Sequence, residues 1–122
     1  MQTTERATAL LLRQLKDIQV QADRIISGEH SAENIEQFAR YSQELKKYAL
    51  DKFKGTEAEY KLHELPAINF LRNKINIAHV VTFSWISILT NERRAREKSL
   101  AEIKEARNKY ASLEFMLRDM LG

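Results

Sequence analysis

The sequence has no cysteine, a single proline and three glycines among its 122 residues. Without cysteine, the chain has neither a disulfide framework nor a thiolate to serve as a nucleophile or metal ligand. So few glycines and prolines argue against a protein built from many strands, which would need frequent turns. These absences favour an all-α domain whose stability rests on an apolar core.

The chain also lacks an excess of charge of one sign, with 20 basic and 17 acidic residues and a net charge of +3. Such a balance is not the footprint of a nucleic-acid-binding protein, and charge alone indicates no partner. The stretch MQTTERATALLL has an acidic residue and no basic start before its apolar run, which is not typical of a signal peptide. We expect a single domain over residues 1–122 that acts in the cytoplasm.

One stretch, INIAHVVTFSWISIL at residues 75–89, has no lysine, arginine or carboxylate, although 30% of all residues are charged. A membrane-spanning helix needs about 20 apolar residues, and about fifteen residues of helix reach only about 22 Å. The stretch also contains polar residues such as Asn76 and His79. We expect it to be a helix of the domain, buried over much of its circumference, and not a membrane span.

The first half of the chain predicts two amphipathic helices, because its apolar residues recur at spacings of three and four. The first is expected to begin at Thr3 or Thr4 and to stop at a left-handed Gly28. The second is expected between a cap at Ser31 and a stop at Gly55. Their stripes supply one half of the core: Leu11, Leu15, Ile18, Ala22 and Ile25 in the first, and Ile35, Phe38, Leu45, Ala49 and Phe53 in the second.

The next segment predicts a short helix followed by a long one. Thr56 and Glu59 match a capping box, which predicts a short helix within residues 57–64. Pro66 ends this helix, because proline is disfavoured in a helix interior. We expect Pro66 near the first turn of a third main helix that continues from Ala67.

The fourth main helix begins at one of two breaks, Thr90–Asn91 or Ser99, which the pattern leaves open. Its apolar stripe is Ile103, Ala106, Tyr110, Leu113, Leu117 and Met120. The fold is therefore expected to be an all-α, up-and-down four-helix bundle with a short extra helix before Pro66. We expect one core to bury eight representatives of these stripes together: Leu15, Ile18, Leu45, Ile75, Ala78, Trp85, Ile103 and Leu113.

The stretch RNKINIAH at residues 72–79 is the arrangement that suggests catalysis. Arg72 and His79 lie two helical turns apart on one face, with Asn76 between them. The pattern resembles the Arg-Asn and trailing His of HEPN-superfamily ribonucleases, which are small helical bundles with paired motifs across a dimer. The resemblance implies that Arg72 steadies the scissile phosphate, Asn73 supports it, and His79 acts as acid or base in RNA cleavage.

The same residues also fit a structural interpretation, in which Arg72 marks a solvated helix start and His79 is a hydrogen-bonded core residue. The other histidines, His30 and His63, form no metal-binding arrangement, because no Glu-x-x-His pair is present. The sequence contains neither a glycine-rich phosphate loop nor a glycine-flanked serine nucleophile. We expect no cofactor and no metal, and we favour a non-catalytic protein over an enzyme.

A basic segment, NERRAREKS at residues 91–99, is a candidate contact for nucleic acid. Two glutamates reduce its net charge to about +2, and no aromatic residue offers a base a stacking platform. Four phosphate contacts would give only weak, salt-sensitive binding. A solvated helix face is the alternative for its four basic residues, Arg93, Arg94, Arg96 and Lys98.

The leading expectation is a non-catalytic interaction or assembly module. Leaving Phe83 and Ile86 in water would forgo roughly 1.5–3 kcal/mol each. With Val80 they would form an exposed apolar patch of the kind that marks an interaction site. We expect a second identical chain to cover this patch, because the two-fold dimer is the commonest assembly. The short helix before Pro66 and an unidentified protein partner are the alternatives.

Overall fold

The computed structural model describes residues 2–70 and 85–121 of the chain, and every regular element in these ranges is a helix. Helix α1 spans Gln2–Ser27, α2 spans Ala32–Lys52, α3 spans Glu59–Leu62 and α5 spans Trp85–Leu121. The fold is therefore all-α, as predicted. None of the helices in the described ranges is both long and apolar enough to cross a bilayer.

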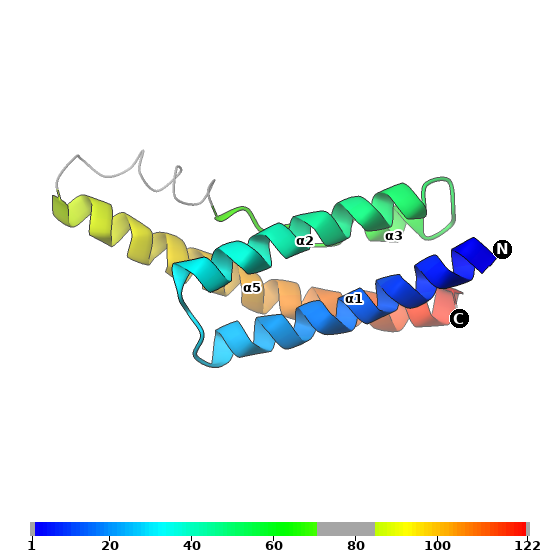
Figure 1. The fold of residues 1–122 in the computed structure, drawn as a ribbon, viewed down its shortest axis with the longest axis horizontal. Coiled ribbons are helices and arrows are strands. Elements are labelled where there is room, and N and C mark those ends of the chain that lie inside the picture. The colour runs from blue at the N-terminus through cyan, green and yellow to red at the C-terminus, as the bar shows by residue number, and fades with distance from the viewer. Residues whose placement is uncertain (1, 71–84, 122) are drawn as a thin grey trace.

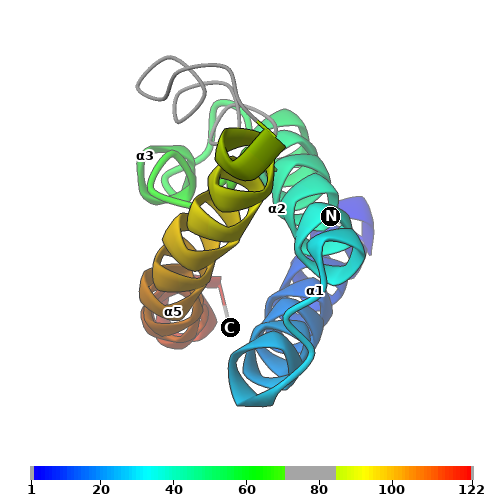
Figure 2. The same cartoon turned by 90° about the vertical axis from the view of Figure 1, so that its left-hand side faces the viewer.

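The long helices α1, α2 and α5 lie side by side along the long axis of the molecule (Figure 1). Both α2 and α5 run antiparallel to α1, so the N- and C-termini lie at the same end. In the end-on view of Figure 2, α5 faces α1 and α2, and α1 makes its most extensive contacts with α5. The helical bundle is confirmed, whereas the order of the four main helices stays a prediction because residues 71–84 lie outside the described ranges.

One apolar core runs between these helices. Apart from Met120, the stripes of α1, α2 and α5 are buried as predicted, because spacings of three and four turn one face of each helix towards its neighbours. The chain between α3 and residue 70 adds further apolar side chains to the core. Burial is confirmed for Leu15, Ile18, Leu45, Ile103 and Leu113, whereas the side chains of Ile75, Ala78 and Trp85 lie outside the described part.

The predicted start of α1 is wrong, and its predicted stop at Gly28 is confirmed in position but not in its left-handed conformation. The helix has already begun at Gln2, so neither Thr3 nor Thr4 is its cap. Gly28 ends the helix without a positive φ, because its N–H reaches back to the carbonyl of Ile25 at 3.3 Å. A left-handed residue is not needed where a last tightened turn satisfies the free carbonyls in this way.

The boundaries of α2 agree better with the prediction. Ser31 is the cap, and its Oγ accepts a backbone N–H of the first turn at 3.1 Å. The chain turns at Gly55, whose φ of 83° is left-handed and suits glycine. The predicted capping box does not form, because the Glu59 carboxylate accepts the N–H of Gly55 at 2.9 Å while the Thr56 hydroxyl donates to the carbonyl of Phe53 at 2.6 Å.

The predicted helix start after Pro66 is also wrong. Residues 65–69 are irregular, so no helix begins at Ala67. The residue before a proline is biased towards extended conformations. In addition, side chains of α2 bind both backbone polar groups of Ile68, which holds this segment in an extended course.

Helix α5 is continuous through Thr90–Asn91 and through Ser99, so neither predicted break exists. Ala95 and Ser99 are fully buried and extend the stripe in steps of four to Ile103. Because the buried face continues without a shift, one helix suffices. The stripe ends before the final turn, where Met120 is 41% exposed rather than buried.

Candidate functional site

Between α3 and residue 70 the chain runs back along the bundle as an irregular segment, drawn in green in Figure 1. We call residues 64–70 the strap. Its apolar side chains Leu65, Ile68 and Phe70 are buried, and its backbone is bonded by side chains from both α2 and α5. The strap therefore belongs to the core although its residues 65–69 are not helical.

Helix α2 supplies two side chains that bind the strap backbone. Ser42 Oγ accepts the N–H of Ile68 at 2.9 Å and donates to the carbonyl of Ala39, on its own helix, at 2.7 Å. Gln43 Nε2 donates to the carbonyl of Ile68 at 2.7 Å. Both backbone polar groups of Ile68 are thereby satisfied by side chains, as buried peptide groups require.

Helix α5 supplies a third contact. The hydroxyl of Tyr110, whose side chain is fully buried, donates to the carbonyl of Pro66 at 2.6 Å. Burial raises the pKa of the Tyr110 phenol above its usual range, and the hydrogen bond with Ser42 offsets only part of this effect. The phenol is therefore a neutral donor, and it joins α2, α5 and the strap in one polar network within the apolar core.

Ion pairs at the surface fix the start of the strap. Glu64 pairs with Lys109 of α5 at 3.2 Å and with Lys61 of α3 at 3.5 Å. The hydrogen bond from Lys109, followed by the positive charges of Lys109 and Lys61, holds the pKa of Glu64 below its usual range. Because these groups are partly exposed, the pairs position the strap more than they stabilise it.

The strap is narrower than a helix, whose side chains fill a cylinder about 10–12 Å across, and it leaves a hollow on each side. One hollow, of about 400 Å³, lies between Pro66–Ile68 and the part of α5 from Glu102 to Lys109. The other, of about 240 Å³, lies between the end of the strap and the part of α2 from Glu36 to Gln43. The strap thus only partly fills the groove in which it lies, between α2 and α5.

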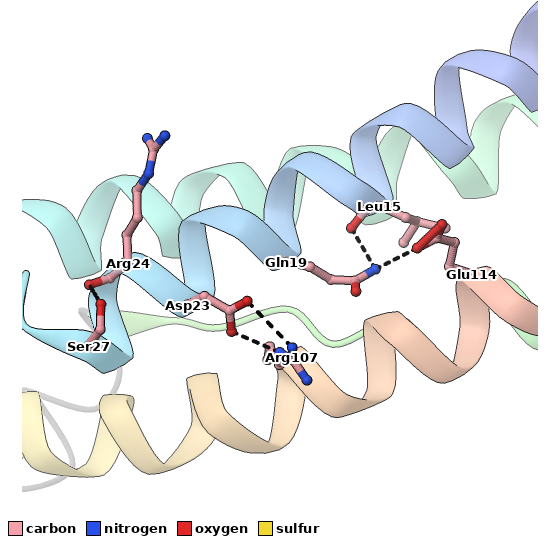
Figure 3. A network of polar contacts seen from close by, with 7 residues as sticks. All are labelled: Leu15, Gln19, Asp23, Arg24, Ser27, Arg107 and Glu114. Atoms are coloured by element: carbon pink, nitrogen blue, oxygen red, sulfur yellow. Dashed lines mark hydrogen bonds and ion pairs between the residues drawn. The ribbon is translucent and has the colours of Figure 1, made fainter.

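The interface between α1 and α5 carries a different polar network along its rim (Figure 3). Gln19 Nε2 donates to Glu114 Oε1 at 2.9 Å, and Arg118 pairs with the same carboxylate at 3.0 Å. Further along, Arg107 Nε donates to Asp23 Oδ1 at 2.8 Å. This network joins one helix to another through side chains, whereas the network at the strap holds a peptide backbone.

A further hollow, of about 670 Å³, lies where α3 meets the end of α5 and is lined by residues that include Tyr60, His63 and Met120. Glu59 also lines it, but its carboxylate already accepts a backbone N–H. Within the described side chains, no three His, Cys, Asp or Glu residues are grouped so that they could hold a metal ion. Glu59 and His63 alone do not form a metal site.

Most residues predicted from the sequence for catalysis or assembly lie outside the described residues, so these predictions remain predictions. The third interface residue, Ile86, lies on α5. The residues outside the described ranges are Arg72, Asn73 and His79 of the ribonuclease-like pattern, and Val80 and Phe83 of the apolar patch.

The predicted basic segment lies on α5, and its side chains are spread around the helix. Successive residues turn by about 100°, so Arg94 and Lys98 lie on one flank and Arg93 and Arg96 on the other. Glu97 lies between the flanks and pairs with Arg93 at 3.4 Å. Arg96 Nε is buried without a hydrogen-bond partner. The segment therefore does not present a continuous row of cations to a phosphate backbone.

Sequence reasoning missed the strap and the residues that hold it. The available signal is Ser42, which lies within the apolar stripe of α2, four residues after Phe38 and three before Leu45. A hydroxyl at a core position needs a hydrogen-bond partner. The local pattern does not identify that partner, because Ile68 follows 26 residues later.

No protein-family model, curated protein or solved structure matches this chain. The fold and the described site nevertheless define a class, an all-α bundle in which side chains of two helices hold a non-helical segment between them. Neutral donors and acceptors, aimed at backbone groups and surrounded by apolar side chains, are suited to binding a polypeptide. Function is therefore inferred from the residues of this chain and their arrangement.

Proposed function

We propose that this protein is a non-catalytic helical-bundle module that assembles with a second copy of itself. The surface of assembly is the apolar stretch at residues 75–89, with Val80, Phe83 and Ile86 at its centre. These side chains gain free energy when another chain covers them. We place this assembly in the cytoplasm, the compartment expected from the sequence.

The observation that carries the proposal is the position of residues 85–89 of α5. The described part of this helix includes the last five residues of the apolar stretch, with the sequence WISIL. In Figure 1, this end of α5 extends further along the long axis than the turn between α1 and α2. Among the described helices, α1, α2 and α3 therefore offer no neighbour to this end of α5, which supports cover by a second chain.

Light scattering behind a sizing column, at micromolar protein, tests the proposal. The unmodified chain should elute with twice its mass of 14.3 kDa. Phe83→Glu and Ile86→Glu should each reduce the mass to that of one chain, because a buried, unpaired carboxylate is costly at an interface. Circular dichroism of the variants should show that the helices remain.

Phe115→Glu is the matched control for these variants. Phe115 lies on α5 at the other end of the helix and is 77% exposed, so the same change there should leave the mass doubled. An unmodified chain that elutes as a single copy contradicts the proposal. So does a dimer that persists when Phe83 and Ile86 are both replaced by glutamate.

A further inference from the structure

We propose that the groove between α2 and α5 is a binding site for an extended peptide segment of another polypeptide, and that the strap occupies this site when no such peptide is bound. The strap shows what the groove accepts, because it is an extended segment seated there with its apolar side chains buried. This inference goes beyond assembly through residues 75–89, since no residue of the groove lies in that stretch.

The groove binds its occupant through backbone atoms. Ser42 Oγ and Gln43 Nε2 pair with the N–H and the carbonyl of Ile68 at 2.9 and 2.7 Å. Tyr110 donates to the carbonyl two residues earlier at 2.6 Å. Every residue except proline offers both backbone groups, so these three side chains can hold any extended segment of suitable shape. Backbone hydrogen bonds combined with side-chain pockets are how proteins recognise extended peptides.

The buried side chains of the strap define the ligand. Leu65, Ile68 and Phe70 are 1%, 3% and 2% exposed. Counted from the position that Leu65 occupies, the ligand therefore carries large apolar residues at the first, fourth and sixth positions. Lys109 and Lys61 lie at the entrance, where Glu64 pairs with both. An acidic residue immediately before the first apolar position is therefore favoured.

The strap can leave the groove while the long helices stay formed. The bonds that hold the backbone of Pro66 and Ile68 come from the side chains of Ser42, Gln43 and Tyr110, so their loss breaks no hydrogen bond within a helix ladder. Segments held by few backbone hydrogen bonds open at lower free energy than packed helices. The hollows on both sides of the strap leave room for an incoming segment to begin binding.

A variant that weakens the strap without changing the groove tests the proposal. Leu65→Ser combined with Ile68→Ser removes two buried anchors, whereas Ala67→Ser, at an exposed strap position, is the matched control. The probe is a fluorescent peptide, acetylated and amidated, with the sequence of residues 64–70. Fluorescence anisotropy should show saturable binding to the double variant that is about ten-fold tighter than to the control, whose own strap competes for the groove.

Adding Tyr110→Phe to the double variant should weaken peptide binding about ten-fold, since one hydrogen bond to the peptide backbone is lost. Equal binding to the double variant and the Ala67→Ser control overturns the proposal. An unchanged affinity after Tyr110→Phe also overturns it, as does the absence of binding to a double variant whose circular dichroism matches that of the unmodified chain.

Hydrogen exchange measured by mass spectrometry on the unmodified chain tests the same proposal without a substitution in the strap. Residues 64–70 should take up deuterium faster than the centre of α1, and an excess of the unlabelled peptide should increase this uptake by displacing the strap. A peptide of the same composition in scrambled order is the control. The proposal is overturned if the strap takes up deuterium as slowly as the centre of α1, or if adding the peptide does not change its uptake.

Discussion

Helix α5 packs on two sides, and the two sides are stabilised in different ways. Where it packs on α1, the apolar core is flanked by charged and polar side chains along the rim. Towards α2 and the strap, the core contains the buried hydroxyl groups of Ser42 and Tyr110. Apolar burial is non-directional and tolerates small shifts, whereas hydrogen bonds depend on the position of single atoms. The α1 side therefore supplies stability, and the strap side selects what lies in the groove.

The largest effect is expected in the apolar core. Leu113 of α5 is fully buried, and Leu113→Ala should lower the free energy of unfolding by about 2–5 kcal/mol through lost burial and a new cavity. Phe115→Ala, two residues further on the same helix and 77% exposed, should change it by no more than about 0.5 kcal/mol. Urea denaturation measures both. Equal losses would mean that the stripe of α5 does not face the core.

A smaller effect is expected when the strap side is altered. Tyr110→Phe keeps the ring but removes the hydroxyl that binds the carbonyl of Pro66. A part-buried carbonyl left without its partner should cost about 1–3 kcal/mol, measured by the same denaturation. Tyr60→Phe, at a tyrosine that is 63% exposed, is the control and should be neutral. A neutral Tyr110→Phe would show that the strap needs no bond from α5.

The dependence of stability on pH separates the hydroxyl of Tyr110 from its ring. Burial raises the pKa of Tyr110 in the folded state, so the unfolded chain loses this proton first as the pH rises above about 10. The contribution of the neutral phenol is fully present below that pH and is lost as the pH rises through the folded-state pKa. The unmodified chain should therefore lose stability faster than Tyr110→Phe, by at most about 1.4 kcal/mol per pH unit. Parallel alkaline profiles would contradict the burial of a protonated phenol.

The turns at the two ends of α2 provide a matched pair of glycines. Gly55, on the way to the strap, has a φ of 83°, Gly28 has no positive φ, and an added Cβ would meet nothing within 4 Å at either site. Gly55→Ala should therefore cost about 1–2 kcal/mol in backbone strain, whereas Gly28→Ala should raise stability by up to about 1 kcal/mol by restricting the unfolded chain. Thermal denaturation compares the two. Similar shifts in both variants would mean that backbone conformation at Gly55 is not what fixes the turn.

The helices on the α1 side could be predicted from the sequence because their signal is local. The stripe from Leu11 to Ile25 repeats every turn, and Ser31 lies directly before the helix that it caps. Local motifs failed where the expected partner was already engaged, as when Glu59 bound the N–H of Gly55 while the N–H of Thr56 donated to Phe53. In this case the sequence identifies a residue type that can cap a helix, but it does not identify the backbone group that the residue binds.

The strap could not be predicted, because its contacts join residues far apart in the chain. Ser42 binds Ile68 across 26 residues, and Tyr110 binds Pro66 across 44. A proline followed by apolar residues is compatible with both a helix start and an extended segment, and the choice between them is made by side chains on other helices. The sequence marks Ser42 as a polar residue in an apolar stripe, but it does not name the backbone that the hydroxyl binds.

The smallest effect is expected at the rim of the α1 side, and it decides whether the contrast between the two sides of α5 holds. Asp23 and Arg107 form an ion pair at 2.8 Å whose side chains are 53% and 40% exposed. Asp23→Asn should therefore lower stability by only about 0.2–1 kcal/mol, and the difference should shrink in about 1 M salt, where charges are screened within about 3 Å. Glu97→Gln, which breaks the more exposed pair with Arg93, is the control and should have a still smaller effect. If Asp23→Asn were as damaging as Leu113→Ala, the α1 side would also depend on single polar atoms, and the two sides of α5 would not differ in kind.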